Sequence, residues 1–304
     1  MIRHISRLSI LTSLLLCLCA CAGNLPPAAD TPAPQIWTPD EGAVSDTDGT
    51  CRVEIPAGTQ TADLSALGGT SASGGLHVTA PGTLKTLILP SGTVSAAVEP
   101  DAASAEKPFS LDLLDASAAE GLTQLVLYGE VKAARIPDSL HTLVFYGGDL
   151  SAFADCPSLT ELSVLHPTDL SPLRDDSPPG VLALFRSPDD EKWDLSPLVR
   201  KPLTILRLMA GISSEEAAAL AGASVVSLQV SDSSVDDLSF LSSMPDTKFL
   251  LLGVSSDQPP EILADPAGPY GADLLPLLNT SIPLDQLLDF AARGTVYAFT
   301  EINR

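Results

Sequence analysis

A short strand-like pattern recurs along this chain and constrains its fold more than any other feature. Two aliphatic or aromatic core residues separated by one residue recur every 18 to 24 residues, as Leu125/Leu127, Leu143/Phe145, Leu162/Val164, Leu182/Leu184, Leu206/Leu208, Leu228/Val230 and Leu250/Leu252. This alternation directs both core side chains to one side of a strand. Because strands this short are not stable alone, the repeats must stack on one another. The pattern predicts a solenoid with a parallel sheet.

The pattern weakens toward the N-terminus. Val53/Ile55, Leu76/Val78 and Leu87/Leu89 are weaker candidates for the same strand. Residues 90–120 do not fit a clean repeat, and we expect an irregular loop or insertion there. The repeat domain is therefore predicted to cover residues 50–255, with 90–120 irregular.

A second repeated feature is the word DLSPL. It occurs at Asp169–Leu173 and Asp194–Leu198, with near-copies at Asp63–Leu67, Asp149–Phe153 and Asp237–Leu241. Ser is a good N-cap residue, and Pro is favoured at the first helical position. We expect each word to form the return corner of a repeat, with both Leu residues inward, Ser as the cap, and a short helix or 3₁₀ turn.

The segment VSDSSVDDLSFL (Val230–Leu241) resembles the internalin-type, 22-residue leucine-rich repeat. Val235, Leu238 and Leu241 match the core positions of that repeat. The resemblance covers residues 120–255 well and 50–120 loosely. It implies an α/β-type leucine-rich repeat solenoid, with a parallel β-sheet on one, concave face and short helical or 3₁₀ turns on the other. In that family the concave face binds protein partners.

This chain departs from the family in its asparagines. Family members stack one Asn per repeat, whereas this chain has only Asn24, Asn279 and Asn303, and none of them lies in a repeat. The turns must therefore be satisfied by Ser hydroxyls, backbone groups or water.

The N-terminus resembles an export signal. Arg3 and Arg7 precede an apolar run, Leu8–Ala20, that is short for a membrane span and suits a signal peptide. Leu18–Cys21 resembles the bacterial lipobox, which predicts a lipid on Cys21. The alternative is ordinary secretion after cleavage. We expect a signal peptide at 1–20 and an exported protein held at the outer face of a bacterial membrane, or in the periplasm, by that lipid.

The segments on either side of the repeats differ from them in composition. Residues 21–49 are rich in Pro, Ala, Asp and Thr, which predicts a disordered tether after the lipidated Cys, although an irregular arm packed on the domain is an alternative. Residues 256–304 are expected to form a C-terminal cap, with a helix near Ile282–Ala292 followed by a β-like segment, because a solenoid needs its last core layer covered.

The charge of the chain excludes one class of partner. The net charge is −22, with 38 Asp and Glu against 16 Lys and Arg. Phosphate backbones require a basic surface, so no nucleic acid is expected. Contact with the membrane is expected through the N-terminal lipid only.

No motif for nucleotide, metal or hydrolytic chemistry is present. His77, His141 and His166 are isolated in sequence and read as structural residues. The acidic segment Asp189–Asp194 reads as a polar insertion, with calcium as a weaker alternative. No cofactor and no metal is therefore predicted. Cys51 and Cys156 should be free thiols, because repeats ~4.8 Å apart place them about 20 Å from each other, beyond disulfide reach.

The remaining candidate for function is a surface. Residues beside the core positions point outward from the sheet, and the predicted binding residues are Val126, Tyr128, Val144, Tyr146, Ser163, Leu165, Phe185, Arg207, Met209 and Gln229. Aromatic residues and Met are enriched in interfaces. The main prediction is a non-enzymatic, membrane-anchored protein-binding module. One alternative is that these residues are core, either because the register is shifted or because the 90–120 insertion covers them. The others are a self-associating envelope component and an enzyme whose site lies in the irregular segments.

Overall fold

The structure is a computed structural model. It describes residues 36–40, 44–47, 49–68, 74–104, 109–173, 179–187, 190–209, 212–230, 238–255 and 284–301. The predicted signal peptide, Cys21, Val235 and residues 256–283 of the predicted cap lie outside the described residues.

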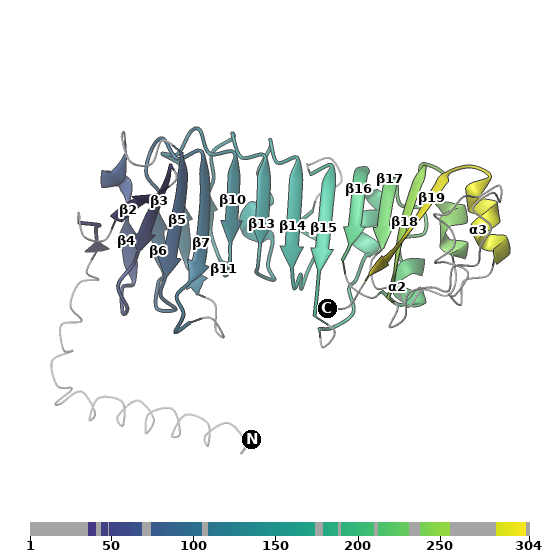
Figure 1. Cartoon of the computed structure of the whole chain (residues 1–304), viewed down its shortest axis with the longest axis horizontal. Coiled ribbons are helices and arrows are strands. Elements are labelled where there is room, and N and C mark those ends of the chain that lie inside the picture. Colours follow the sequence, from purple (N-terminus) through teal and green to yellow (C-terminus); the bar gives the residue numbers. More distant parts are fainter. Residues whose placement is uncertain are drawn as a thin grey trace, which may run out of the picture. The chain divides into compact units, whose positions relative to one another are not determined.

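A 12-stranded sheet, called here the long sheet, runs through the repeat domain (Figure 1). Its strands pair in parallel, except for β2 and β3, which pair antiparallel. In spatial order the strands are β2 (Val44–Thr47), β3 (Thr50–Glu54), β5 (Gly75–Ala80), β7 (Ser95–Pro100), β10 (Gln124–Leu127), β13 (Thr142–Phe145), β14 (Glu161–Leu165), β15 (Val181–Phe185), β16 (Leu203–Leu208), β17 (Val225–Val230), β18 (Phe249–Ser255) and β19 (Thr295–Glu301). The predicted solenoid with a parallel sheet on one face is confirmed.

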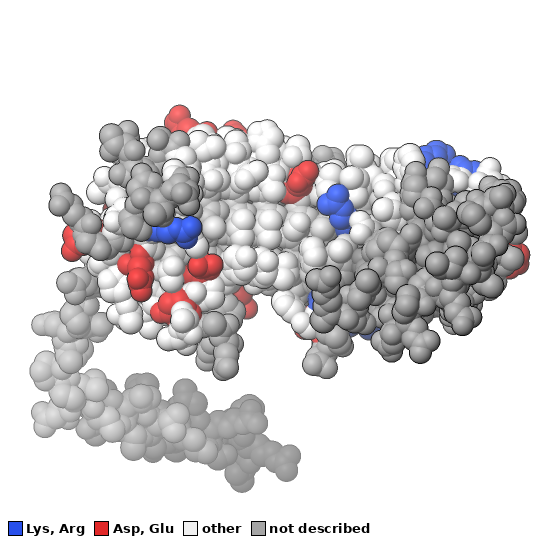
Figure 2. Space-filling view, in the orientation of Figure 1, with Lys and Arg blue, Asp and Glu red and all other residues white. Residues whose placement is uncertain are grey.

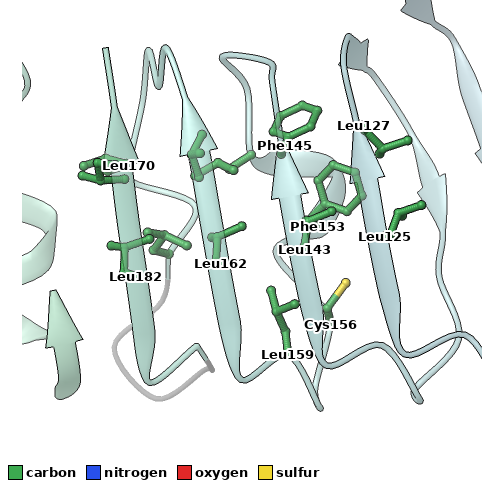
Figure 3. Packing of buried hydrophobic residues seen from close by; sticks show 14 of the residues in the cluster. Leu125, Leu127, Leu143, Phe145, Phe153, Cys156, Leu159, Leu162, Leu170 and Leu182 are labelled. Carbon is green, nitrogen blue, oxygen red and sulfur yellow. The ribbon is translucent and has the colours of Figure 1, made fainter. Parts of the chain in front are cut away.

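The registers of the long sheet confirm the predicted core alternation. Leu125 lies beside Leu143, which lies beside Leu162, and the same row continues through Leu182 and Leu206. All five side chains are buried. Figure 3 shows buried hydrophobic side chains from neighbouring strands, including Phe145 and Phe153, packed in one layer against the sheet.

The first half of the domain has a second parallel sheet where return turns were expected. Its strands, in spatial order, are β1 (Ile36–Trp37), β4 (Thr61–Asp63), β6 (Thr86–Ile88), β9 (Leu113–Asp115) and β12 (Ala134–Arg135), and a separate pair joins β8 (Ser110–Leu111) to β11 (Glu130–Val131). The prediction of helical or 3₁₀ turns is therefore incomplete for this half. The candidate pair Leu87/Leu89 belongs to this sheet, not to the long one.

In the second half the return side consists of short turns, as predicted. These are the 3₁₀ helices η2 (Ser151–Phe153), η3 (Ser196–Arg200) and η4 (Ser239–Ser243), the α-helix α2 (Ser214–Ala218), and a turn over Leu170–Leu173; a further 3₁₀ helix, η1 (Ser65–Leu67), lies in the first half. The first Leu of each described DLSPL-like word is buried, as expected.

The capping chemistry of these words differs from the prediction. The Oδ1 atom of Asp63, Asp149, Asp169 and Asp194 accepts a hydrogen bond of 2.8–3.0 Å from the N–H of the Ser two residues later. That Ser begins the turn and has a backbone N–H that needs an acceptor, which the preceding carboxylate supplies in an Asx turn. The expected Ser cap is wrong, and Asp has that role.

Two predicted boundaries also differ from the structure. Residues 90–120, expected to be irregular, contain β7, β8 and β9. Ala96 and Val98 fill the core positions of β7, and these small residues hide the Leu pattern. Within the expected tether, β1 pairs with β4, and β2 pairs antiparallel with β3, so the domain includes residues from Ile36 onward. A strand over the first repeat protects an otherwise open sheet edge.

At the other end, α3 (Leu284–Ala291) and β19 agree with the expected helix and β-like segment. Gln286 Oε1 accepts a 2.6 Å hydrogen bond from the Leu238 N–H, and Arg293 donates to the carbonyls of Leu241 and Met244. Phe290 is buried against the core. These contacts join the last described helix to the return turn η4.

Candidate functional site

All ten predicted binding residues lie on the outer face of the long sheet. Val126, Val144 and Ser163 lie side by side on β10, β13 and β14, and the same row continues through Ala183 to Arg207 and Gln229. Each of the ten is half-buried or exposed, whereas Ala183 in this row is buried. The register therefore agrees with the prediction, and the alternative that these residues form core is wrong.

Five of these residues form a continuous apolar row at the carboxyl ends of five neighbouring strands. This row, called here the strip, consists of Tyr128, Tyr146, Leu165, Phe185 and Met209. Leu165 lies directly beside Phe185 in the register of β14 and β15. Figure 2 shows that the middle of this face, over β10 to β15, carries few Lys, Arg, Asp or Glu residues.

The two tyrosines of the strip are stacked. Their ring centroids lie 3.9 Å apart, with an angle of 21° between the ring planes. Burial raises the pKa of Tyr146 to about 12, and the hydrogen bond and charge of Tyr128 act in the same direction. The Tyr146 phenol is therefore neutral at ordinary pH, and it offers an apolar ring with a hydrogen-bonding tip.

Next to the strip, β3, β5 and β7 carry a chain of polar groups. Arg52 Nη1 lies 2.6 Å from His77 Nδ1, and His77 Nε2 lies 2.7 Å from Glu99 Oε1. A guanidinium only donates, so Nδ1 is the acceptor in the contact with Arg52. His77 is thus part of a polar chain that borders the strip where β10 meets β7. Spacing in the sequence did not predict these contacts.

A cavity of about 320 Å³ lies between the loops that follow β14 and β15. The two exact copies of DLSPL face it, because Asp169 and Leu170 of one word and Asp194 and Pro197 of the other line its wall. The other lining residues are His166, Pro167, Thr168, Asp190, Glu191, Lys192 and Trp193. The predicted polar insertion is therefore one wall of a cavity.

His166 and Asp190 meet at the edge of this cavity. His166 has a left-handed backbone (φ 54°), and its Nδ1 lies 2.5 Å from Asp190 Oδ2. Burial opposes ionisation of Asp190, but hydrogen bonds from His166 and the Ser187 N–H outweigh it and lower the pKa of the carboxyl group. The contact between His166 and Asp190 holds both side chains at the edge of the cavity.

Behind the cavity wall, a buried ion pair joins two repeats. Arg186 donates to both carboxylate oxygens of Glu216, and its guanidinium carbon lies 4.6 Å from the centre of the Trp193 ring. Glu216 also accepts from the Trp193 N–H at 2.9 Å and forms a capping box with Ser213. These contacts hold the 190–194 loop against α2.

The described part of the chain contains no group of three His, Cys, Asp or Glu residues that could hold a metal ion. No disulfide joins Cys51 and Cys156, as predicted, and both side chains are buried. Burial, followed by the charges of Asp155 and Asp138, raises the pKa of Cys156 to about 11.

Among the described helices, none has the length and apolar character needed to cross a bilayer. No protein-family model matches the chain, and no curated protein matches it. Among solved structures, the chain is similar to an internalin (InlF) from Listeria monocytogenes, with 16% sequence identity, a TM-score of 0.30, and coverage of 67% of this chain and 75% of that chain. The solenoid fold described above rests on the strand pairing of this chain itself.

Proposed function

We propose that this chain is a protein-binding module and that the strip is its contact surface. The observation that carries this proposal is the row of five half-buried apolar side chains, contributed by five neighbouring strands, on the outer face of the long sheet. Scattered exposed apolar residues are ordinary, but a contiguous apolar surface is typical of an interaction site.

The composition and the rigidity of the strip favour a protein partner. Tyr and Met are enriched in protein interfaces, and a stacked Tyr pair has already lost much of its side-chain freedom. Every strip residue stands on, or directly after, a strand that is hydrogen-bonded on both sides, so the surface needs little ordering when a partner binds. The polar chain of Arg52, His77 and Glu99 provides a polar rim on one side.

The proposal includes the location of the module. We place it outside the cytoplasm, held at a bacterial membrane by a lipid on Cys21, because Leu18–Cys21 follows the lipobox pattern. We also propose a non-enzymatic role, in which the side chains of the strip bind and do not react.

The decisive test compares three forms of the full chain. Wild type, a Tyr128→Ser/Tyr146→Ser variant and an Ile36→Ser/Val94→Ser control are immobilised and exposed to envelope and host-cell extracts. Ile36 and Val94 are exposed apolar residues outside the strip, so the control removes exposed apolar side chains elsewhere on the domain. We expect a partner that the wild type and the control retain and the tyrosine variant loses, and its binding should be reproduced with the purified partner.

Two results would contradict the proposal. A partner retained equally by all three forms binds elsewhere on the chain. Association of the wild type with itself, with loss of self-association in the tyrosine variant, would instead support a self-associating envelope component. Circular dichroism spectra of the three forms verify that each is folded.

A further inference from the structure

The cavity and the strip lie beside each other. Leu165 and Phe185 end β14 and β15, and the loops that begin directly after them form the two sides of the cavity. A partner segment in contact with these two strip residues therefore reaches the cavity within a few residues of its own length.

The cavity has an apolar floor and a negatively charged rim. Leu170 and Trp193 are 4% and 6% exposed. Asp169, Asp190, Glu191 and Asp194 contribute carboxylates, and Lys192 contributes the one ammonium group of the described lining. That ammonium lies 2.8 Å from Glu215, which does not line the cavity, so the rim carboxylates are not neutralised by it.

The walls of the cavity are held in place before any ligand arrives. The Ser171 and Ser196 N–H groups orient the carboxylates of Asp169 and Asp194. The Trp193 backbone is hydrogen-bonded to Glu216, and its ring is packed against Arg186. A preorganised site loses less conformational entropy on binding.

We propose that the strip and this cavity form one docking surface for a basic segment of the protein partner. A Lys or Arg side chain of that segment enters the cavity, and an apolar neighbour contacts Leu165 and Phe185. This proposal rests on the proposed function and adds the chemistry of the partner.

Charge complementarity carries this assignment. A Lys or Arg side chain has a hydrocarbon stem and a cationic end, which match a floor of Leu170 and Trp193 below a rim of carboxylates. Complementary charge also steers a basic partner toward a chain whose net charge is −22. An acidic or purely apolar segment would leave the rim carboxylates desolvated without a partner.

The experiment uses a phage-displayed library of random linear peptides selected on the immobilised full chain. We expect the selected peptides to contain an apolar residue close to a Lys or Arg. Replacing that basic residue by norleucine in a synthetic peptide should weaken binding to the wild type by about tenfold or more, because hydrogen bonds between charged groups are among the stronger ones.

The chain offers a closely matched control. The Asp169→Asn/Asp194→Asn variant removes two rim charges and leaves an amide oxygen to accept from each Ser N–H. The Asp63→Asn/Asp149→Asn variant makes the same change at the same position of two other words, whose Asp residues do not line the cavity. Only the first variant should lose the preference for a basic residue. Glu191→Gln should weaken the same peptides, because Glu191 contributes a carboxylate to the rim.

The possible outcomes separate this proposal from the proposed function. The selected peptides are also tested on a Leu165→Ser/Phe185→Ser variant. Peptides that bind this variant less well but show no preference for a basic residue would overturn the proposed role of the cavity and support that of the strip. If both Asp variants lose the preference for a basic residue equally, the preference is a general effect of charge, and the proposed role of the cavity is also overturned. A library without any selected peptide contradicts docking of a linear segment, and the capture experiment then decides the function of the strip alone.

Discussion

The substitution Glu216→Gln tests the energetic description of the cavity wall. Glu216 is 3% exposed and Arg186 is 10% exposed at their side chains, so this ion pair is largely removed from water. Glu216 receives hydrogen bonds from Arg186, from the Trp193 N–H, and from the N–H and Oγ of Ser213. The substitution keeps the size of the side chain and removes its charge, so the buried Arg186 guanidinium loses the opposite charge of Glu216.

The expected loss in the free energy of unfolding is about 3 kcal/mol. Removing one partner of a buried ion pair typically costs about 3–5 kcal/mol. The lower value applies here because the Gln oxygen can still accept one of the hydrogen bonds. The double variant Arg186→Met/Glu216→Gln should lose about 1–3 kcal/mol less than the sum of the two single variants, because the two residues are in direct contact.

The assay is urea denaturation followed by Trp193 fluorescence. The chain has two Trp residues, so Trp37→Phe leaves Trp193 as the single reporter, next to the substituted pair. A local reporter is needed because repeats of a solenoid can unfold separately. Glu215→Gln is the matched control: it is the adjacent residue with the same change of chemistry, in an exposed pair with Lys192. It should change the denaturation midpoint little.

The dependence on pH follows from the lowered pKa of Glu216. Burial opposes ionisation, but hydrogen bonds from Arg186, Ser213 and Trp193 outweigh it and lower the pKa below the usual 4.5. The ionised pair therefore contributes stability above that value, and this contribution is lost as the pH falls through the lower, folded-state pKa. Between about pH 5 and about pH 3, the free energy of unfolding should fall more for the wild type than for Glu216→Gln. If Glu216→Gln lowers the midpoint of urea denaturation no more than Glu215→Gln does, the reasoning is refuted.

Two further predictions concern the cysteines. Cys51 and Cys156 should resist maleimide labelling at pH 8 in the folded chain and react after denaturation, because both are buried and the Cys156 thiol has a pKa of about 11. Peptide mapping by mass spectrometry reports the labelling of each site. Labelling of the native chain at the rate of the unfolded chain would contradict the burial. Cys21→Ser should move the protein from the membrane fraction to the soluble fraction of the producing bacterium, and continued membrane association on an immunoblot would exclude the lipid anchor.

The repeats from Leu125 onward could be predicted because their core positions hold large aliphatic residues at a regular period. The earlier repeats were partly missed because Cys51, Ala62 and Ala96 occupy core positions there. Small residues bury well where strands of the two sheets face each other, but they leave no period-2 signal in the sequence. The second sheet was missed because its strands are only two or three residues long, too short to display an alternating pattern.

The DLSPL word illustrates a limit of local reasoning. Its Leu residues were assigned to the core correctly, because hydrophobic burial depends on a pattern that the sequence displays directly. Its cap was assigned to the wrong residue, since Asp and Ser both accept hydrogen bonds from nearby N–H groups. Backbone geometry selects between them, and here Asp194 accepts from the Ser196 N–H.

The sequence alone determined that this chain forms a stack of short strands with an acidic surface, and which faces of the later strands point outward. Tertiary structure decided which outward residues meet. Tyr128 and Tyr146 are stacked only because their strands are neighbours in the same register. Asp169 and Asp194 face one cavity, and Arg186 and Glu216 form one ion pair, because stacking brings together residues 25 and 30 positions apart. Periodicity is a local property of a sequence, whereas contacts between loops depend on how each repeat turns before it returns to the sheet.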